Sequence, residues 1–271
     1  MRRCGVLGDP VAHSLSPVLH RAAYRAAGLS WEYDAHRVGT GGLAEFVGGL
    51  DASWRGLSLT MPLKREALGL VDALSETARL AGAVNTLLLG GNGLVGDNTD
   101  VPGAAAALVA RGVTVVGAAT VLGGGATATS VGLALVDLGA ERLTVLVRDP
   151  DRAAATVAAL TAHPAGPHVR VGVLDVDAVT GDLVVSTIPA VAQDRAMVGR
   201  CDEVPVVFDV VYDPWPTPLA AAAPARGQVL VSGLDLLVHQ AALQFALFTG
   251  LPAPVAVMRE AGEGALRDRT G

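Results

Sequence analysis

One lysine stands out among the side chains that could do acid–base chemistry. Of the 20 basic residues, 19 are arginines and only Lys64 is a lysine. An arginine keeps its proton near neutral pH, whereas a lysine ammonium can donate one during a reaction. Lys64 ends a polar loop, Thr60-Met61-Pro62-Leu63-Lys64, that follows an apolar run. We predict a chemical role for this lysine.

A glycine-rich turn is the second chemical feature. It spans residues 122–128, with the sequence LGGGATA, between an apolar run and a helical segment. The G-x-G-x-x-A spacing gives a tight turn at Gly123, lets a pyrophosphate approach the backbone at Gly125, and allows close helix packing at Ala128. A helix N-terminus also attracts anions. The cofactor-binding residues predicted in this turn are Gly123, Gly124, Gly125, Ala126 and Thr127.

Charged residues at the end of the next predicted strand bear on the choice of cofactor. An acid at this position favours NAD, whereas an arginine favours the 2′-phosphate of NADP. This sequence has both, as Arg148 and Asp149, with Arg152 one helical turn further on. We favour NADP, with Arg148 contacting the adenine or the phosphate.

Hydroxyl groups gather near the N-terminus. Ser16 and Pro17 indicate an N-cap and the first residue of a helix that runs to about Ala27. Ser14 adds a second hydroxyl at this helix N-terminus, which favours a carboxylate ligand. Further along, Asp100 is expected to cap a helix over residues 101–111.

Hydrophobic periodicity predicts the elements that position these residues. From Val115 on, apolar runs alternate with alanine-rich helical stretches, a β-α-β pattern typical of a parallel sheet covered on both faces. Strands are expected over 4–7, 31–38, 56–59, 84–89, 94–96, 115–122, 143–147, 169–173, 183–186 and 206–210. Helices are expected over 16–27, 41–49, 101–111, 126–138, 150–160, 234–249 and, briefly, 255–260. The predicted fold class is α/β with two lobes.

Composition excludes several classes of protein. With 271 residues, 51% of them hydrophobic, the chain can bury a large core. A net charge of −6 without a basic run argues against a nucleic-acid partner. The uncharged stretches 112–136 and 236–258 contain glycines, polar residues or prolines, so we expect buried elements and no membrane partner. Two cysteines and no signal-like N-terminus favour the cytoplasm, and six scattered histidines predict no metal site.

Taken together, these motifs resemble the shikimate dehydrogenase family over nearly the whole chain. The landmarks are Ser14-Leu15-Ser16-Pro17, Thr60-Met61-Pro62-Leu63-Lys64, Ala83-Val84-Asn85-Thr86, Asn98-Thr99-Asp100, the Gly123 turn, Tyr212-Asp213-Pro214-Trp215-Pro216-Thr217-Pro218-Leu219 and Gly233-Leu234-Asp235-Leu236-Leu237-Val238-His239-Gln240-Ala241. The resemblance implies NADPH-dependent reduction of 3-dehydroshikimate to shikimate, in aromatic amino-acid biosynthesis. It implies a substrate-binding catalytic domain over residues 1–102 and 235–271, and an NADP-binding Rossmann domain over 103–234.

The resemblance also assigns roles to residues. Lys64 and Asp100 match the catalytic pair: Lys64 would offset the charge that develops on the carbonyl oxygen and donate a proton, while Asp100 would hold the ammonium. Substrate binding is assigned to Ser14, Ser16, Ser58, Thr60, Asn85, Tyr212 and Gln240. Arg148, Arg152, Thr187 and Gly233 join the glycine turn in binding NADP.

Two departures from the family pattern keep alternatives open. Ser58 stands where the family usually has Asn, so one contact to a ring hydroxyl is expected to be shorter or water-mediated. Asp149 adds an acid beside Arg148. The nearest alternative is therefore a relative that also oxidises quinate or prefers NAD. A non-catalytic dinucleotide or metabolite sensor would be expected to lose the Lys64–Asp100 pair, which is present. A homodimer is left open.

Overall fold

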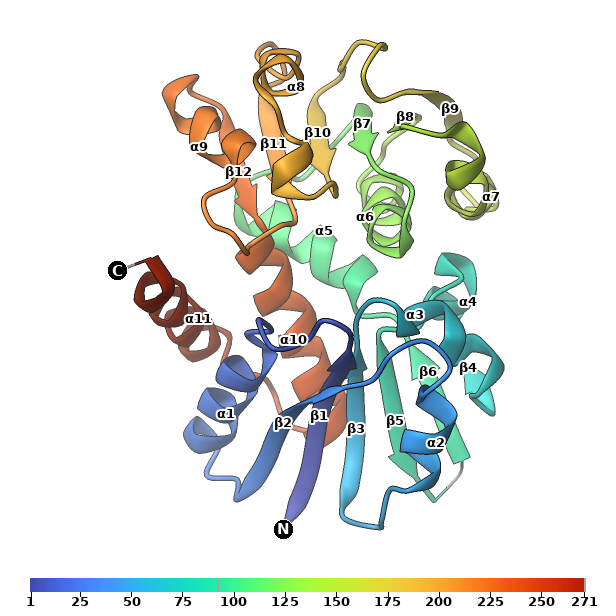
Figure 1. Cartoon of the computed structure of the whole chain (residues 1–271), viewed down its shortest axis with the longest axis vertical. Helices are drawn as coiled ribbons and strands as arrows, with labels where there is room; N and C mark the ends of the chain where they lie inside the picture. Colours follow the sequence, from blue (N-terminus) through green and yellow to red (C-terminus); the bar gives the residue numbers. More distant parts are fainter. Residues whose placement is uncertain (92, 271) are drawn as a thin grey trace. The chain divides into compact units, whose positions relative to one another are not determined.

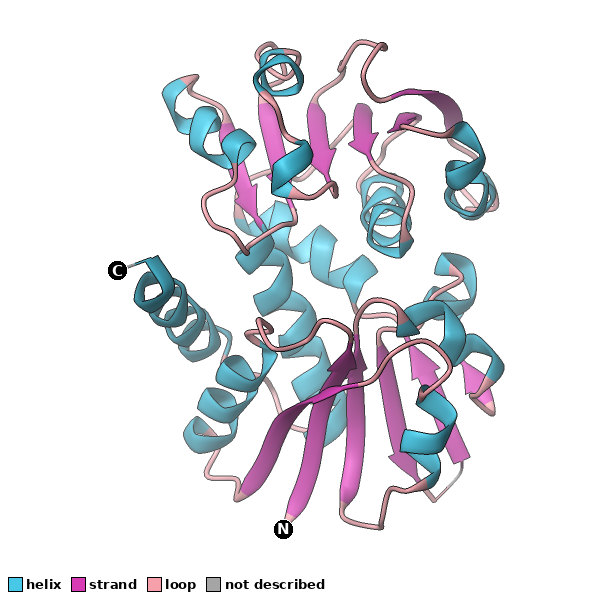
Figure 2. Ribbon diagram, viewed as in Figure 1, coloured by secondary structure: helices cyan, strands magenta, loops and turns pink. Residues whose placement is uncertain are grey.

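The computed structural model describes residues 1–91 and 93–270. The chain divides into two compact units: unit 1 comprises Met1–Thr99 with Leu237–Gly271, and unit 2 comprises Asp100–Leu236. Each unit is built on its own six-stranded sheet with helices around it (Figure 1; Figure 2), which confirms the predicted α/β class. Within the described ranges, no helix combines the length and apolar character needed to cross a bilayer.

The sheet of unit 1 has the strand order β2-β1-β3-β5-β6-β4. Its strands are β1 (Arg2–Gly8), β2 (Trp31–Arg37), β3 (Trp54–Leu59), β4 (Ala73–Leu74), β5 (Thr86–Gly90) and β6 (Gly93–Asp97). β1 runs parallel to β2 and β3, whereas β5 is antiparallel to both β3 and β6. Because β1 and β3 end at the same edge, the loops carrying Ser14 and Thr60 begin at neighbouring points.

The two faces of this sheet pack against different helices. The helices of unit 1 are α1 (Ser16–Ala26), α2 (Leu43–Gly48), α3 (Leu63–Glu66), the 3₁₀ helix η1 (Ala67–Gly69), α4 (Glu76–Ala81), α11 (Val255–Thr270) and the part of α10 (Gly233–Thr249) from Leu237 on. Leu57 of β3 lies in an apolar cluster with Leu43 of α2. Gly56, on the opposite face, lets α10 approach closely: a Cβ there would lie 2.1 Å from the Phe248 ring.

Two helix predictions in unit 1 are wrong in detail. Ser16 is the first residue of α1, and its N-cap is Leu15 without a side-chain cap. The hydroxyl two residues earlier does the capping, because Ser14 Oγ accepts from the Ser16 amide at 3.3 Å. The C-terminal helix was expected to end near residue 260, but α11 continues to Thr270. Its buried residues Met258 and Leu266 follow helical spacing, and α11 packs on α1.

The sheet of unit 2 has the order β12-β11-β10-β7-β8-β9, and all its pairs are parallel. Its strands are β7 (Ala118–Leu122), β8 (Arg142–Val147), β9 (His168–Val173), β10 (Leu183–Ser186), β11 (Val206–Asp209) and β12 (Val229–Ser232). This is the doubly wound order of a Rossmann-type domain, in which the chain reverses direction across the sheet after the third strand. The reversal places the first strand, β7, between β8 and β10.

Helices precede, connect and follow these strands, except that β9 leads to β10 without a helix. They are α5 (Asp100–Ala110), α6 (Ala126–Asp137), η2 (Pro150–Ala153), α7 (Ala154–Thr161), η3 (Ala190–Ala192), α8 (Arg195–Gly199), α9 (Pro218–Ala225) and the start of α10. The helix predicted over 150–160 is split, since η2 is a 3₁₀ turn ahead of α7. Asp100 was expected to precede its helix as a cap; α5 begins with Asp100 itself.

Candidate active site

Thr60 follows the carboxyl end of β3, at the side of the unit 1 sheet where the parallel strands β1 and β3 both end. Its amide donates to the Leu7 carbonyl at 2.9 Å, and the Asp9 amide donates to the Met61 carbonyl at 3.0 Å. The loop after β3 therefore lies directly against the end of β1. Gly8 makes this approach possible, because a Cβ there would lie 2.3 Å from Thr60 Cγ2. Thr60 is thus held at a defined position at this edge.

Lys64 lies on α3, one turn beyond Thr60. Its carbonyl accepts from the Val84 amide at 2.7 Å, so the backbone of Lys64 is tied to the segment that carries Asn85. The last residue of this short helix is anchored as well: the Glu66 carboxylate accepts from the Gly41 and Leu43 amides at 2.8 and 3.1 Å. The lysine side chain is half-buried and starts from a fixed backbone.

Asn85 is the centre of a buried polar network. Its Oδ1 accepts from the Thr99 amide at 2.8 Å and from Thr86 Oγ1 at 2.7 Å. Its Nδ2 donates to Thr99 Oγ1 at 2.9 Å and to Gln240 Oε1 at 3.4 Å. Gln240 reaches Asn85 from α10, so residues about 155 positions apart meet here. Thr99 was not among the residues predicted from the sequence.

Ser58 has two internal partners. Its hydroxyl donates to Gln244 Oε1 at 2.7 Å and lies 2.6 Å from the Tyr33 hydroxyl. Ser58 and Gln244 are both almost fully buried. Sequence reasoning missed Gln244, although its spacing of four residues from Gln240 on an apolar helix was an available signal.

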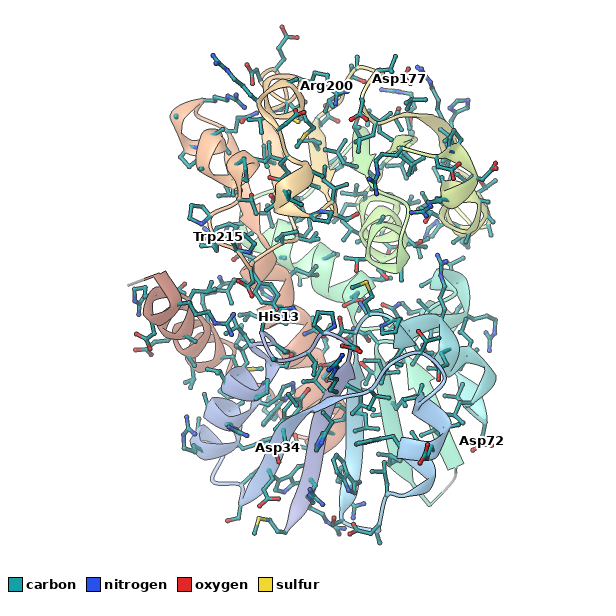
Figure 3. All side chains as sticks on the ribbon, in the orientation of Figure 1. His13, Asp34, Asp72, Asp177, Arg200 and Trp215 are labelled. Atoms are coloured by element: carbon teal, nitrogen blue, oxygen red, sulfur yellow. The ribbon has the colours of Figure 1, made fainter. Side chains whose placement is uncertain are left out.

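The two serines of the N-terminal loop lie together at the start of α1. Ser14 is half-buried and Ser16 is buried. His13, labelled in Figure 3, precedes them and is exposed in the same loop. Ser14, Ser16, Ser58, Thr60, Lys64, Asn85 and Gln240 all belong to unit 1.

In unit 2 the glycine turn leaves the end of β7 at the reversal point of the strand order. Gly123 has φ of +113°, a conformation that glycine adopts readily, and a Cβ there would lie 2.3 Å from Thr187 Oγ1. Thr187, at the end of β10, donates from Oγ1 to the Leu122 carbonyl at 2.9 Å. Gly123 and Thr187, two of the residues predicted to bind the cofactor, are therefore adjacent. Ala126 and Thr127 form the first turn of α6.

Two buried threonines hold the glycine turn from behind. Thr156 Oγ1 donates to the Gly124 carbonyl at 3.0 Å and lies 2.8 Å from Thr129 Oγ1. At Gly124 a Cβ would lie 3.0 Å from the Arg152 carbonyl, so the turn is also packed against η2. Sequence analysis did not identify these threonines.

The charged residues after β8 have different surroundings. Arg148, Asp149 and Arg152 are all exposed. Asp149 caps η2, because its Oδ1 accepts from the Asp151 amide at 3.1 Å. Its other oxygen lies 4.0 Å from Arg152 Nε. Asp149, the acid that kept NAD open as the cofactor, therefore caps the 3₁₀ turn η2.

The loop after β11 carries Tyr212, which is half-buried. Trp215, labelled in Figure 3, lies on the same loop. The buried Asp209 carboxylate ties the loop down: it accepts from Thr217 Oγ1 at 2.5 Å, Gln193 Nε2 at 2.9 Å and the Val211 amide at 3.2 Å. Burial raises the pKa of the Asp209 carboxyl, and these donors oppose the rise. Gly233 packs on this loop, because a Cβ there would lie 2.3 Å from the Val210 carbonyl.

Asp100 is buried and is the first residue of α5, where a helix N-terminus favours a carboxylate. It belongs to unit 2. Over residues 1–91 and 93–270, no three His, Cys, Asp or Glu side chains gather where they could hold a metal ion.

The strand order and the glycine turn define unit 2 as a Rossmann-type α/β domain. A family model described as "Shikimate dehydrogenase substrate binding domain" matches residues 6–87. Another, described as "Shikimate 5'-dehydrogenase C-terminal domain", matches residues 233–261. A curated relative from Moorella thermoacetica, named shikimate dehydrogenase (NADP(+)), is 37% identical over 93% of this chain and 90% of its own length.

Solved structures agree with these sequence matches. The shikimate dehydrogenase of Mycobacterium tuberculosis is 42% identical, with a TM-score of 0.89, over 98% of this chain and 100% of that chain. A shikimate 5-dehydrogenase of Thermus thermophilus, solved with NADP(H) and shikimate, is 35% identical, with a TM-score of 0.83, over 98% of this chain and 100% of that chain. The chain belongs to the shikimate dehydrogenase family, which confirms the resemblance seen in the sequence.

Proposed function

We propose that this protein is an NADP-dependent oxidoreductase that reversibly reduces 3-dehydroshikimate to shikimate. The observation that carries the proposal is the polar edge of the unit 1 sheet, where the backbone of Lys64 is bonded to the segment of Asn85, which in turn contacts Gln240. Amides and an ammonium suit a small polyhydroxylated ketone, since they bind ring hydroxyls and a developing oxyanion. Family membership supports the same reaction.

The residues of unit 2 fit a dinucleotide. Around Gly125 a Cβ would meet nothing within 4 Å, so space for a phosphate lies open at the N-terminus of the twelve-residue helix α6. Residues proposed to hold NADP are Gly123, Gly124, Gly125, Ala126, Thr127, Arg148, Arg152, Thr187 and Gly233. When bound, the reduced nicotinamide supplies the hydride. Exposed arginines after β8 support NADP over NAD, because each can pair with a 2′-phosphate.

In the proposed mechanism Lys64 donates a hydrogen bond to the substrate carbonyl oxygen and then gives that oxygen its proton. Asp100 is proposed to hold the ammonium and to bind a ring hydroxyl. Ser14, Ser16 and Tyr212 are proposed to bind the substrate carboxylate. Thr60, Asn85 and Gln240 are proposed to bind the ring hydroxyls.

The proposal includes a division of labour along the chain. Residues 1–102 and 235–271 would bind substrate, and residues 103–234 would bind NADP. The match of a substrate-binding family model to residues 6–87 supports the first assignment. The Rossmann-type strand order of β7–β12 supports the second.

One absorbance assay tests the proposal. The purified protein is incubated with shikimate or quinate and with NADP⁺ or NAD⁺, and reduction of the nicotinamide is followed. We expect shikimate with NADP⁺ to have the highest kcat/KM. Higher kcat/KM with quinate or NAD⁺ would favour the relaxed dehydrogenase, and no turnover with any pair would favour a sensor.

Two further assignments belong to the proposal. The cytoplasm is supported by Cys4 and Cys201, which are both free and buried thiols. A homodimer is supported by two exposed leucines one turn apart on α10, Leu243 and Leu247, and by the exposed Leu251 just after this helix. Sedimentation velocity of the purified chain checks the dimer.

A further inference from the structure

Gln244 lies at the centre of a buried chain of hydrogen bonds in unit 1. Its side chain is 1% exposed. Its Nε2 donates to the Asn85 carbonyl at 3.2 Å and to Thr86 Oγ1 at 2.9 Å. Because a backbone carbonyl can only accept, this contact fixes which end of the Gln244 amide is the nitrogen. The other end, Oε1, must then accept, and it does so from the Ser58 hydroxyl.

The direction set at Gln244 continues toward Asn85. Thr86 Oγ1 has accepted from Gln244, so its own hydrogen is free to donate, and it does so to Asn85 Oδ1 at 2.7 Å. The Thr99 amide donates to the same oxygen at 2.8 Å. The nitrogen of the Asn85 amide is therefore turned toward Gln240 Oε1. The two hydrogens of Asn85 Nδ2 go to Thr99 Oγ1 and, over a longer distance, to Gln240 Oε1. A ligand hydroxyl that inserts between Nδ2 and Oε1 would therefore meet one donor and one acceptor.

The chain of hydrogen bonds also has a fixed direction on the other side of Gln244. Ser58 has one hydroxyl hydrogen, which is committed to Gln244, so Tyr33 must donate to Ser58. Burial raises the pKa of the Tyr33 phenol, and the hydroxyls of Ser58 and Ser16 oppose this rise. The His20 ring stacks on Tyr33 with centroids 4.1 Å apart, and burial lowers the pKa of His20 to about 3. Both neighbours are thus neutral at physiological pH.

We propose that Gln244 is a positioning residue for substrate binding. Ser58 acts through Gln244 and does not itself donate a hydrogen bond to the substrate. Gln244 holds the Asn85 backbone and, through Thr86, sets the direction of the Asn85 amide. Asn85 Nδ2 and Gln240 Oε1 then receive one ring hydroxyl. This inference rests on the proposed function and adds to it a residue that contacts no substrate.

Two variants of Gln244 separate the effect of hydrogen-bond direction from that of packing. Gln244→Glu keeps the shape and the acceptor but replaces the donor that faces the Asn85 carbonyl. Gln244→Met keeps the volume and removes every polar contact. In both we expect the KM for shikimate to rise by about tenfold, the scale of one buried hydrogen bond, and the KM for NADP⁺ to change by less than about twofold.

The matched control is Phe245→Leu, at the next position on α10. Phe245 is fully buried against Tyr24 and makes no contact in this chain of hydrogen bonds. We expect this variant to lose thermal stability while its KM for shikimate stays within about twofold of the wild-type value. An equal rise in KM for Phe245→Leu and Gln244→Glu would show that packing alone matters, and would overturn the inference.

A readout without turnover distinguishes this inference from the proposed function. The Thr99 amide donates a hydrogen bond to Asn85 Oδ1, so the rate of hydrogen exchange at the Thr99 amide measures how firmly the Asn85 side chain is held in place. We expect faster exchange at Thr99 in Gln244→Glu than in Phe245→Leu. Unchanged exchange overturns the inference even in an active enzyme. A wild-type protein that does not oxidise shikimate overturns the proposed function, whatever the exchange shows.

Ser58→Ala completes the test. Removing this hydroxyl leaves Gln244 Oε1 without its donor, and we expect the KM for shikimate to rise by about threefold. In a Gln244→Met background the same substitution should have no further effect, because its route of action is gone. A rise that persists in that background would mean that Ser58 contacts substrate directly, and would overturn the second half of the proposal.

Discussion

A guanidinium in place of the ammonium of Lys64 would offer a hydrogen bond without a releasable proton. In the proposed mechanism, the single lysine therefore has a role that none of the 19 arginines could take. The backbone of Lys64 is held by Val84, so loss of the side chain should leave the fold in place. Catalysis and binding can therefore be separated at this residue.

We predict that Lys64→Ala lowers kcat by about 10²–10³, the scale of about 2.7–4 kcal/mol measured for one oxyanion donor. The KM for shikimate should stay within about threefold, because the ring hydroxyls keep their amide partners. Steady-state kinetics check this, with Arg65→Ala at the exposed neighbouring position as the control. A wild-type kcat in Lys64→Ala would remove Lys64 from the mechanism.

At Arg148 the prediction concerns the cofactor. Arg148→Ala should raise the KM for NADPH at least about tenfold while changing the KM for NADH little, because only NADPH carries the 2′-phosphate. Asp149 should cap η2 in the wild type and in Arg148→Ala alike, because its partner is the Asp151 amide. Arg142→Ala, at the opposite end of β8, is the control. Equal effects on both cofactors would show that Arg148 does not contact that phosphate.

At the scale of elements, the loop between β11 and α9 depends on Thr217. Its hydroxyl donates to Asp209 and accepts from the Ala220 amide at the start of α9. Thr217→Val removes a helix cap and leaves a buried carboxylate short of one donor. We expect a loss of about 2 kcal/mol or more in the free energy of unfolding, together with a higher KM for shikimate, since the loop carries Tyr212.

Urea unfolding of Thr217→Val and Thr217→Ser checks this prediction. The serine keeps the hydroxyl, so we expect it to lie within about 0.5 kcal/mol of the wild type. Equal losses in the two variants would show that keeping the hydroxyl does not preserve stability, and would leave the capping argument without support.

The elements that the sequence predicts best are those with strong periodicity. β10 was predicted to the residue, and the other central strands of unit 2 to within a few positions, because fully buried strands are continuous apolar runs. β4, α3 and α4 were missed, since two to six residues are too few to show a period. Their positions are set by contacts with the rest of unit 1.

Among the candidate site residues, those with a local sequence pattern were predicted and most of those without one were missed. The glycine turn was found because its local strand-turn-helix context is visible in the sequence. Thr156 and Gln244 were missed because each acts on residues distant in the chain, such as Gln244 on Asn85, 159 positions away. Asp209 was missed although its partners Val211 and Thr217 are close in sequence, because a single acid after an apolar run is not a distinctive pattern. The family resemblance assigned Ser58 to substrate, and no local pattern in the sequence indicates that Tyr33 and Gln244 engage its hydroxyl.

At the scale of the whole molecule, the buried His20 ring makes the free energy of unfolding depend on pH in the acid range. Burial lowers its pKa to about 3 from an ordinary value of 6.5. Between these values the unfolded chain binds a proton that the native state excludes, so the free energy of unfolding falls as the pH drops through this window. The full slope from one group is about 1.4 kcal/mol per pH unit. Tyr24 and Tyr33, packed against the ring, keep their protons throughout.

We predict that His20→Phe, which keeps a ring against Tyr33, loses less stability than the wild type between pH 7 and pH 5. Urea unfolding at both values measures the difference. Asp209, whose pKa is raised by burial, contributes equally to both proteins and cancels in the comparison. Parallel loss of stability in the two proteins would mean that His20 takes up its proton in the native state.

Unit 1 is assembled from two separated stretches of chain, and this affects how the protein is made. A ribosome releases the six strands of the first sheet early, but helix α10 emerges only after all of unit 2. Until then the nascent sheet lacks the Phe248 ring that covers Gly56, and Asn85 lacks both glutamines. The first part of unit 1 is therefore made with the sheet face that α10 later covers still exposed, and a chain terminated before α10 would lack Gln240, Gln244 and Phe248.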